Sequence, residues 1–215
     1  MASSTILILG ATGPAGICLL RESLFRKHPT VVYVLEGQMD DIERLGNAVS
    51  KASVVISLLG PNGKVKGGEF PYPGYYSAIF PLMRRHSVKS ILALATVSVE
   101  DTNDKSSFIR RALVTGVKYG FAAGYRTMVG IGRVFQEEAE ALNWTVFRVG
   151  MVQGEHDEGS WKKDRDDPIF AGQVGETGWT WYIRRGAMAK WLVDRIEDDD
   201  DVVGSRTPAL SNRKV

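Results

Sequence analysis

Three glycines near the beginning of the chain, Gly10, Gly13 and Gly16, have the spacing of a turn that binds a phosphate group. Residues 5–9 before them are apolar or β-branched and typical of a buried strand, and an apolar pattern of helical period follows. In such a unit the glycines let the backbone approach a phosphate, and the helix N-terminus directs free N–H groups toward it. Pro14 suits the helix start, where its missing N–H is not needed. We therefore predict a dinucleotide-binding turn. The alternative is a turn without a ligand.

The hydroxyl group of Ser98 is a candidate proton donor, because it comes shortly after an apolar run. Residues 89–95 are typical of a buried strand, and Thr96 and Ser98 come directly after them. In open α/β sheets substrates bind beyond the carboxyl ends of the central strands, so Ser98 is placed to polarise a carbonyl group. The alternative is that Ser98 only begins a loop. Tyr125, in the helical region that comes next, is the second candidate catalytic residue.

The composition bounds the fold and its partners. The 215 residues, 44% of them hydrophobic, are enough for one core, and we predict a single domain, 1–215. The 27 basic and 25 acidic residues are interspersed and leave a net charge of +2, which argues against nucleic-acid binding. The one cysteine, Cys18, excludes an internal disulfide and fits a reducing compartment. With no apolar run long enough to span a membrane and no basic leader, we expect a cytoplasmic protein that has no membrane partner and no metal site.

The elements that position these residues follow from the hydrophobic period. We predict helices over residues 17–25, 42–50, 75–86 and 184–196, and strands over residues 31–36, 54–59, 89–95, 144–149 and 172–181. The apolar region 108–142 contains five glycines, each of which costs about 1 kcal/mol relative to alanine inside a helix. We therefore predict two helices there, with a break near 120–124. Residues 64–74 and 150–163 are predicted as loops.

The glycine turn resembles that of a known family. Gly10-Ala11-Thr12-Gly13-Pro14-Ala15-Gly16 is similar to the G-A-T-G-x-x-G of the atypical short-chain dehydrogenases/reductases, an NAD(P)H-binding group that includes NmrA-like and biliverdin reductase B-like proteins. Residues 52–60, 144–150 and 208–212 agree with the family in the same order. The resemblance implies an α/β, Rossmann-like three-layer fold with a mostly parallel sheet, and NADP as the cofactor, with NAD as the alternative.

The resemblance also implies which residues contact that cofactor. Besides residues 10–16, the family places Leu59 and Gly60 beside the middle of the cofactor, Thr96 at the end of the next strand, and Arg148 in a segment near the site. Arg148 is the one charge in its strand, and pairing beneath the site is the other interpretation of it.

Residue Glu36 has two interpretations. It falls twenty residues after Gly16, where a Rossmann fold places the acid that binds the adenosine ribose of NAD. Alternatively, residues 36–41 resemble the end of the family's third strand, so that Gln38 and Met39 flank the adenine. On this second interpretation, which we favour, one early strand of the standard fold is missing.

The catalytic pair of standard short-chain dehydrogenases, Tyr-x-x-x-Lys, is absent. The residues four positions after Tyr119 and Tyr125 are Ala123 and Val129, and no other tyrosine has a lysine at that spacing. The leading hypothesis is an NAD(P)H-dependent reductase of a small carbonyl or enone compound, with Ser98, Tyr125 or water supplying the proton. Two alternatives stay open: a dinucleotide-sensing regulator without turnover, and a cofactor-independent isomerase or cyclase.

Overall fold

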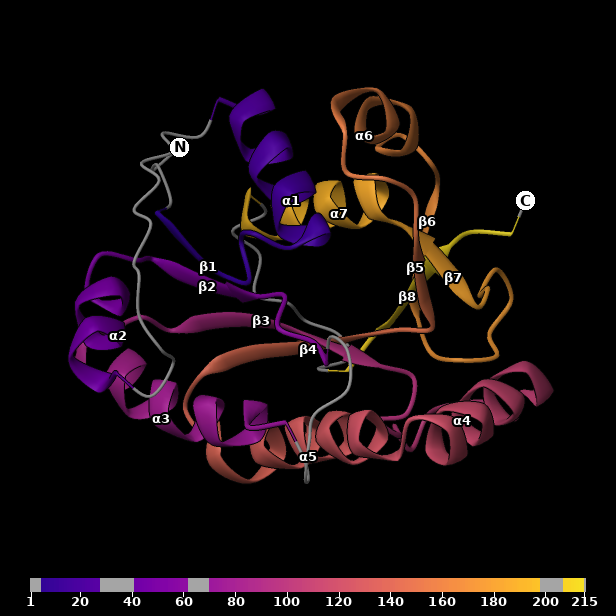
Figure 1. Ribbon diagram of the computed structural model, residues 1–215, viewed down its shortest axis with the longest axis horizontal. Helices are drawn as coiled ribbons and strands as arrows, with labels where there is room; N and C mark the ends of the chain where they lie inside the picture. The colour runs from indigo at the N-terminus through magenta and orange to yellow at the C-terminus, as the bar shows by residue number, and fades with distance from the viewer. Residues whose placement is uncertain (1–4, 28–40, 62–69, 198–206, 215) are drawn as a thin grey trace.

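The computed structural model describes residues 5–27, 41–61, 70–197 and 207–214 and has three layers, a sheet between two groups of helices (Figure 1). The described residues form a six-stranded sheet in the order β1-β2-β3-β4-β8-β6. These strands are β1 (Ile6–Leu9), β2 (Val54–Ser57), β3 (Ser90–Thr96), β4 (Asn143–Val149), β8 (Ala209–Asn212) and β6 (Ile169–Gly172). All neighbours are parallel except β6, which is antiparallel to β8. This mostly parallel α/β architecture is the one that the sequence predicts.

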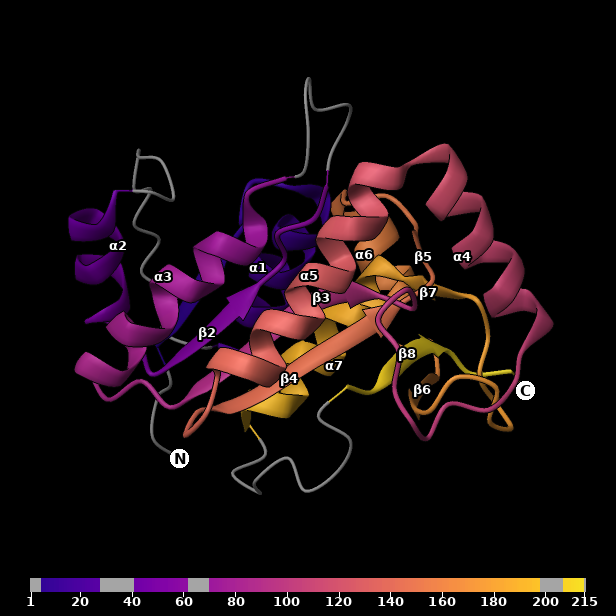
Figure 2. The same cartoon turned by 90° about the horizontal axis from the view of Figure 1, so that it is seen from below.

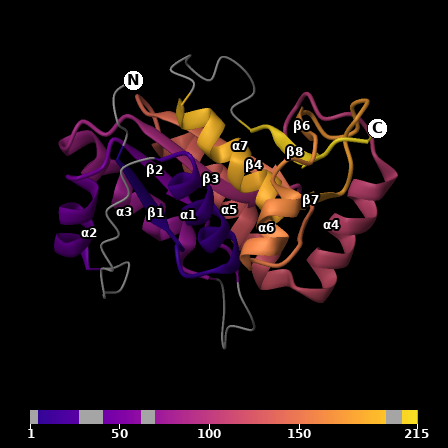
Figure 3. The ribbon, with the colours of Figure 1, turned by 90° about the horizontal axis from the view of Figure 1, so that it is seen from above.

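The helices cover both faces of the sheet. On one face lie α1 (Pro14–Phe25), α6 (Glu158–Asp164) and α7 (Arg185–Glu197), and α1 and α7 pack side by side across the strands (Figure 3). On the other face lie α2 (Ile42–Val49), α3 (Tyr72–Arg85) and α5 (Ala122–Glu138), while α4 (Phe108–Gly120) lies at the outer end (Figure 2). None of the helices in the described ranges is long and apolar enough to cross a membrane.

Strand β3 shows how the sheet divides the core in two. Ile91, Ala93 and Ala95 belong to a cluster with buried residues of α3 and α5, whereas Leu92 belongs to a second cluster with α1 and α7. Successive side chains of a strand point to opposite faces, and both faces are covered, so every residue between Ser90 and Thr96 is apolar. The parallel register brings the carboxyl ends of β1, β2, β3 and β4 to one edge of the sheet.

The predicted break between two helices in the region 108–142 is confirmed. Helix α4 ends at Gly120, and α5 begins at Ala122 after Phe121, whose φ of −145° and ψ of 58° are not helical. Gly124 allows this turn, because a Cβ atom there would lie 2.2 Å from the Phe121 ring. The direction change therefore depends on a glycine that accommodates an aromatic ring.

Two predicted segments are wrong. Residues 150–163 are not a continuous loop, because they contain β5 (Met151–Gln153) and most of α6, whose first turn is capped by the Asp157 side chain. Residues 172–181 are not a strand: β6 ends at Gly172, and β7 (Tyr182–Arg184) begins later and pairs with β5. Positive φ values at Gly175 and Gly178 interrupt the extended chain between them.

Other boundaries shift by a few residues. Helix α3 begins at Tyr72, so the predicted loop ends earlier than residue 74. The predicted strand at 31–36 lies outside the described residues, and so does the question of a missing early strand.

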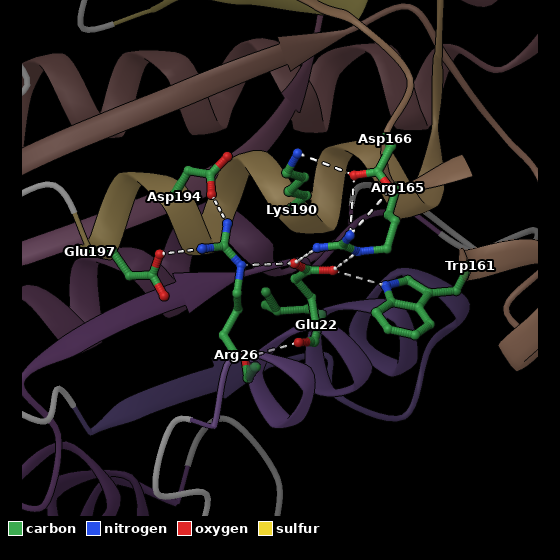
Figure 4. Close-up of polar contacts among 10 residues, drawn as sticks. Glu22, Arg26, Trp161, Arg165, Asp166, Lys190, Asp194 and Glu197 are labelled. Carbon is green, nitrogen blue, oxygen red and sulfur yellow. Dashed lines mark hydrogen bonds and ion pairs between the residues drawn. The ribbon is translucent and has the colours of Figure 1, made fainter. Parts of the chain in front are cut away.

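A buried carboxylate ties α1 to α6 and α7 (Figure 4). Glu22 is 0% exposed and accepts hydrogen bonds from Trp161 Nε1 at 3.2 Å and from Arg165 Nη2 at 2.8 Å. Arg26 donates to Glu22 at 3.2 Å and also pairs with residues of α7. Burial alone opposes ionisation of Glu22, but the hydrogen bonds and charges of Arg165 and Arg26 outweigh it and lower its pKa. The helix that follows the glycine turn is thereby anchored by charge as well as by packing.

Candidate functional site

The glycine turn has the backbone that its sequence predicts. Gly10 has φ of +85°, a conformation that other residues rarely adopt, and it packs against the backbone of Leu58 and Leu59. Its carbonyl accepts a hydrogen bond of 3.2 Å from the Gly13 N–H. Ala11 and Thr12 form the tip of the turn, where Thr12 is exposed. The turn therefore leaves β1 sharply and remains accessible from solvent at the carboxyl edge of the sheet.

Gly16 lets α1 begin directly above this turn. A Cβ atom at Gly16 would lie 2.3 Å from the Gly10 carbonyl oxygen, a distance that no side chain tolerates, whereas one at Gly13 would make an ordinary contact of 3.5 Å. Gly13 is the N-cap and Pro14 the first helical residue. The N–H groups of Ala15 and Gly16 have no acceptor within the described residues. Two such donors at a helix N-terminus, beside glycines that have no side chain, fit the diphosphate of a dinucleotide.

The end of β2 lies against the same turn. Leu59 and Gly60 are partly exposed and follow β2, and the contact of Gly10 with the Leu58–Leu59 backbone places them beside the glycine turn. Gly60 also approaches the Leu94 side chain of β3. Thus the structure brings the predicted contacts at 10–16 and 59–60 together. Gln38 and Met39 lie outside the described residues.

Ser98 lies just beyond the carboxyl end of β3. Thr96 ends the strand, and its Oγ1 accepts a weak 3.4 Å hydrogen bond from the Ser98 N–H. Ser98 is 4% exposed, and the residues on either side of it are held by other elements. The Val97 N–H donates to the Val149 carbonyl of β4 at 3.0 Å, and the Val99 carbonyl accepts from Arg148 at 3.0 Å. The segment that carries the hydroxyl is therefore fixed on both sides.

Arg148 is buried beneath this segment, with its side chain 0% exposed. Its Nε donates to the Thr207 carbonyl at 2.6 Å, and its Nη1 donates to the Val99 carbonyl. Nη1 and Nη2 each donate to one carboxylate oxygen of Asp104, at 2.6 and 2.8 Å, and Nη2 also donates to Gln173 at 3.0 Å. A guanidinium has five N–H donors, and all of them have acceptors here. Arg148 thus has no donor left for a cofactor, and it acts on the site through the segment that it holds.

Tyr125 lies in the first turns of α5, partly exposed. It is seven residues before Gly132, and positions seven apart share a helix face. Gly132 is where α5 meets the Ser98 segment, because a Cβ atom there would lie 2.6 Å from a methyl group of Val99. Tyr125 therefore lies on the face of α5 that is directed to that segment, about 10 Å along the helix from the contact. No hydrogen bond joins Ser98 and Tyr125 within the described residues.

The position of Tyr119 on the surface does not fit a catalytic acid inside the site. It lies in the last turn of α4 and is 81% exposed. Lys118 beside it is directed elsewhere, because its Nζ lies 5.9 Å from the centre of the Tyr125 ring. The standard arrangement of tyrosine and lysine four residues apart is thus not replaced by Lys118 and Tyr119.

Comparisons with known proteins bear on the fold. No family model and no curated protein matches the sequence. Among solved structures, a wide-type short-chain dehydrogenase/reductase from Veillonella parvula, in complex with NADP, has a TM-score of 0.67 at 15% identity, covering 97% of this chain and 94% of that chain. The chain therefore shares the α/β fold of this short-chain dehydrogenase/reductase structure. This confirms the fold that the sequence resemblance implies.

Two further structures agree with this fold. ChuY, an anaerobilin reductase from Escherichia coli O157:H7, has a TM-score of 0.69 at 13% identity, covering 99% of this chain and 98% of that chain. The oxidoreductase ylbE from Lactococcus lactis has a TM-score of 0.63 at 15% identity, covering 98% and 92%. The similarity extends over nearly the whole length in each case.

Sequence reasoning missed two residues that organise the site. Asp104 neutralises Arg148 from 44 residues away, and Arg110 donates from α4 to the Val97 carbonyl at 2.9 Å. Neither lies in a motif. The one signal in the sequence is the isolated charge of Arg148 in an apolar strand, which requires a buried partner without identifying it.

Proposed function

We propose that this protein is an NAD(P)H-dependent reductase of a small carbonyl or enone compound, and that it acts in the cytoplasm with NADP as the preferred cofactor. The observation that carries the proposal is the glycine turn, whose two N–H donors have no acceptor in the described part of the chain and which lies at the same edge of the sheet as Ser98. The NADP-bound and reductase neighbours share the fold and add support.

In this proposal the chain's own residues divide the work. Gly10, Gly13 and Gly16 let the backbone reach the diphosphate, and the N–H groups of Ala15 and Gly16 bind it. A reduced nicotinamide supplies a hydride when it is bound. Ser98 donates a hydrogen bond to the substrate carbonyl oxygen, where negative charge develops. Tyr125 or water then supplies the proton.

A nucleotide titration tests the first half of the proposal. Calorimetry with NADP(H) and NAD(H) should give micromolar binding to the wild-type chain. Gly13→Glu should abolish binding, because the carboxylate would occupy the phosphate site and repel the negatively charged phosphate. The structure makes this variant informative: a side chain at Gly13 meets only an ordinary contact, and φ is −75°, so the fold is not strained. Gly13→Ala is the comparison variant: it adds a methyl group without a charge and should weaken binding less than Gly13→Glu does.

The outcomes separate the three functions. NADPH oxidation with one of a panel of enones and quinones supports the reductase. Tight nucleotide binding without oxidation of NADPH on that panel would instead favour the dinucleotide-sensing regulator. No binding of either nucleotide at millimolar concentration would exclude both and leave the cofactor-independent isomerase or cyclase.

A further inference from the structure

Helix α4 lies at the outer end of the molecule, against the carboxyl edge of the sheet (Figure 2). None of its 13 residues is buried. Its inward side carries Arg110, Val114 and Lys118, and each of these reaches a different part of the candidate site. A helix with so little buried surface gains little stability from its packing. Its contacts with the site therefore call for another explanation.

The first of these contacts joins the beginning of α4 to the Ser98 segment. Arg110 Nε donates to the Val97 carbonyl at 2.9 Å, and its Nη2 pairs with Glu100 at 3.3 Å. Because Arg148 donates to the Val99 carbonyl, the carbonyls of Val97 and Val99, the residues on either side of Ser98, each accept a hydrogen bond from an arginine. The two arginines come from α4 and β4. The peptide plane that precedes Ser98 and the one that follows Val99 are thus held by two different elements.

The second contact joins the end of α4 to Tyr125. Lys118 Nζ lies 5.9 Å from the centre of the Tyr125 ring, within the range of a cation–π interaction. Arg110 and Lys118 are eight residues apart, about 12 Å along the helix. One helix therefore places a cation at each of the two candidate proton donors. Between these cations, Val114 packs with Val97 and Val174.

We propose that α4 is the positioning element of the candidate site, with Arg110 fixing the Ser98 segment and Lys118 holding the Tyr125 ring. The proposal rests on the proposed function in one respect, that Ser98 and Tyr125 serve the reaction. Arg110 and Lys118 are positioning residues, because they act through Ser98 and Tyr125. The guanidinium of Arg110 is suited to this role, because its planar fork gives two donors in a fixed geometry to a carbonyl and a carboxylate together.

Hydrogen exchange tests the proposal without a substrate. In Arg110→Ala, the amide protons of residues 97–99 should exchange about 10-fold faster than in the wild type, the effect of losing one hydrogen bond. Arg111→Ala is the matched control, since the Arg111 side chain is exposed and makes no hydrogen bond within the described residues. Glu100→Gln removes the ion pair but keeps the bond to Val97, and should also leave exchange unchanged. Equal exchange rates in Arg110→Ala and Arg111→Ala would overturn the role of Arg110.

Turnover then tests whether positioning matters for the reaction. Arg110→Ala should lower kcat about 10-fold and leave the KM for NADPH unchanged, because the glycine turn is not touched. Added guanidinium should restore part of kcat, and Arg111→Ala should behave as the wild type. If Arg110→Ala lowers kcat no more than Arg111→Ala, the positioning role is wrong.

The Lys118 contact has its own readout. Lys118→Met should shift the side-chain NMR resonances of Tyr125, and Lys118→Arg should restore them, because arginine also stacks on aromatic rings. Unchanged resonances in Lys118→Met would remove Lys118 from the proposal. If the wild type binds no nucleotide and reduces nothing, the proposed function fails, whereas the exchange and NMR results still decide what α4 does.

Discussion

Arg148 and Asp104 form a two-point ion pair in which Nη1–Oδ2 is 2.6 Å and Nη2–Oδ1 is 2.8 Å. The pair joins the end of β4 to the loop that follows β3. Both side chains are almost completely withdrawn from solvent. A pair of this kind costs desolvation energy, so its contribution becomes visible when one partner is removed.

Replacement of Arg148 by Met should destabilise the protein by about 3 to 5 kcal/mol, because it leaves the Asp104 carboxylate buried without a cation. Urea unfolding of the variant gives the change. The double variant Arg148→Met with Asp104→Leu should recover part of the loss, since no charge is then left unpaired. If the double variant is as unstable as the sum of the two single variants, the pair is not coupled as the geometry indicates.

Glu22 should make stability depend on pH in the acid range. Its pKa is lowered from an ordinary value of 4.5, so its contribution is fully present above that value and is lost as pH falls through the lowered pKa. Glu22→Gln should lose about 2 to 3 kcal/mol at pH 7 and show a flatter decline below pH 4.5. Urea unfolding over a pH series measures both effects. Glu43→Gln, an exposed carboxylate in the first turn of α2, is the control and should keep the wild-type profile.

Gly13 and Gly16 should respond differently to replacement by alanine. Gly16→Ala places a Cβ atom 2.3 Å from the Gly10 carbonyl oxygen, and it should cost about 1 to 3 kcal/mol or prevent folding. Gly13→Ala meets only an ordinary contact and should change the free energy of unfolding by less than about 1 kcal/mol. Thermal unfolding distinguishes the two. Equal shifts in Tm would contradict the close approach of α1 to the turn.

Ser98→Ala should lower kcat/KM on an active enone or quinone by about 10- to 100-fold, the loss of one hydrogen bond in the transition state of about 1.4 to 2.7 kcal/mol. Tyr119→Phe should have little effect, because the Tyr119 side chain is exposed at the end of α4. Steady-state kinetics of both variants give the comparison. An unchanged rate in Ser98→Ala would remove Ser98 from the mechanism and make Tyr125 the next residue to test.

Cys18 should be unreactive toward thiol reagents in the folded protein. It is 0% exposed, and burial raises its pKa to about 11, although Arg185 and Arg21 act in the opposite direction. At pH 8 the thiol is therefore protonated as well as inaccessible. Labelling should occur only after unfolding in urea, and rapid labelling without urea would contradict its place in the core.

The sequence predicts the core strands well because both of their faces are buried and almost all of their residues are apolar. The strands β2, β3 and β4 are covered on both faces, so β2 and β3 are almost entirely apolar and β4 is apolar apart from Asn143, Thr145 and Arg148. The glycines at 120–124 predict the break before α5. The sequence does not predict β5 and α6, because a strand of one exposed and two partly exposed residues and a polar seven-residue helix carry no such pattern. Their existence depends on pairing with β7 and on the Asp157 cap.

The candidate site divides in the same way. The glycine turn is local, so its spacing alone predicts its backbone. The environment of Arg148 is not local: its acceptors come from residues 99, 104, 173 and 207, and only the folded chain brings them together. That is why the sequence left both cofactor contact and pairing open for Arg148, and why Arg110 was not found at all.

The anchor of α1 also sets an order of assembly during synthesis. Glu22 is bonded to Arg165, 143 residues further along the chain, and Arg26 reaches Glu197, 171 residues further along. A chain that leaves the ribosome from its N-terminus therefore exposes the glycine turn and α1 long before the partners of Glu22 and Arg26 have been translated. Helix α1 is thus made well before it is secured, and a truncated chain that ends before Arg165 lacks the ion pairs that tie α1 to Arg165 and α7.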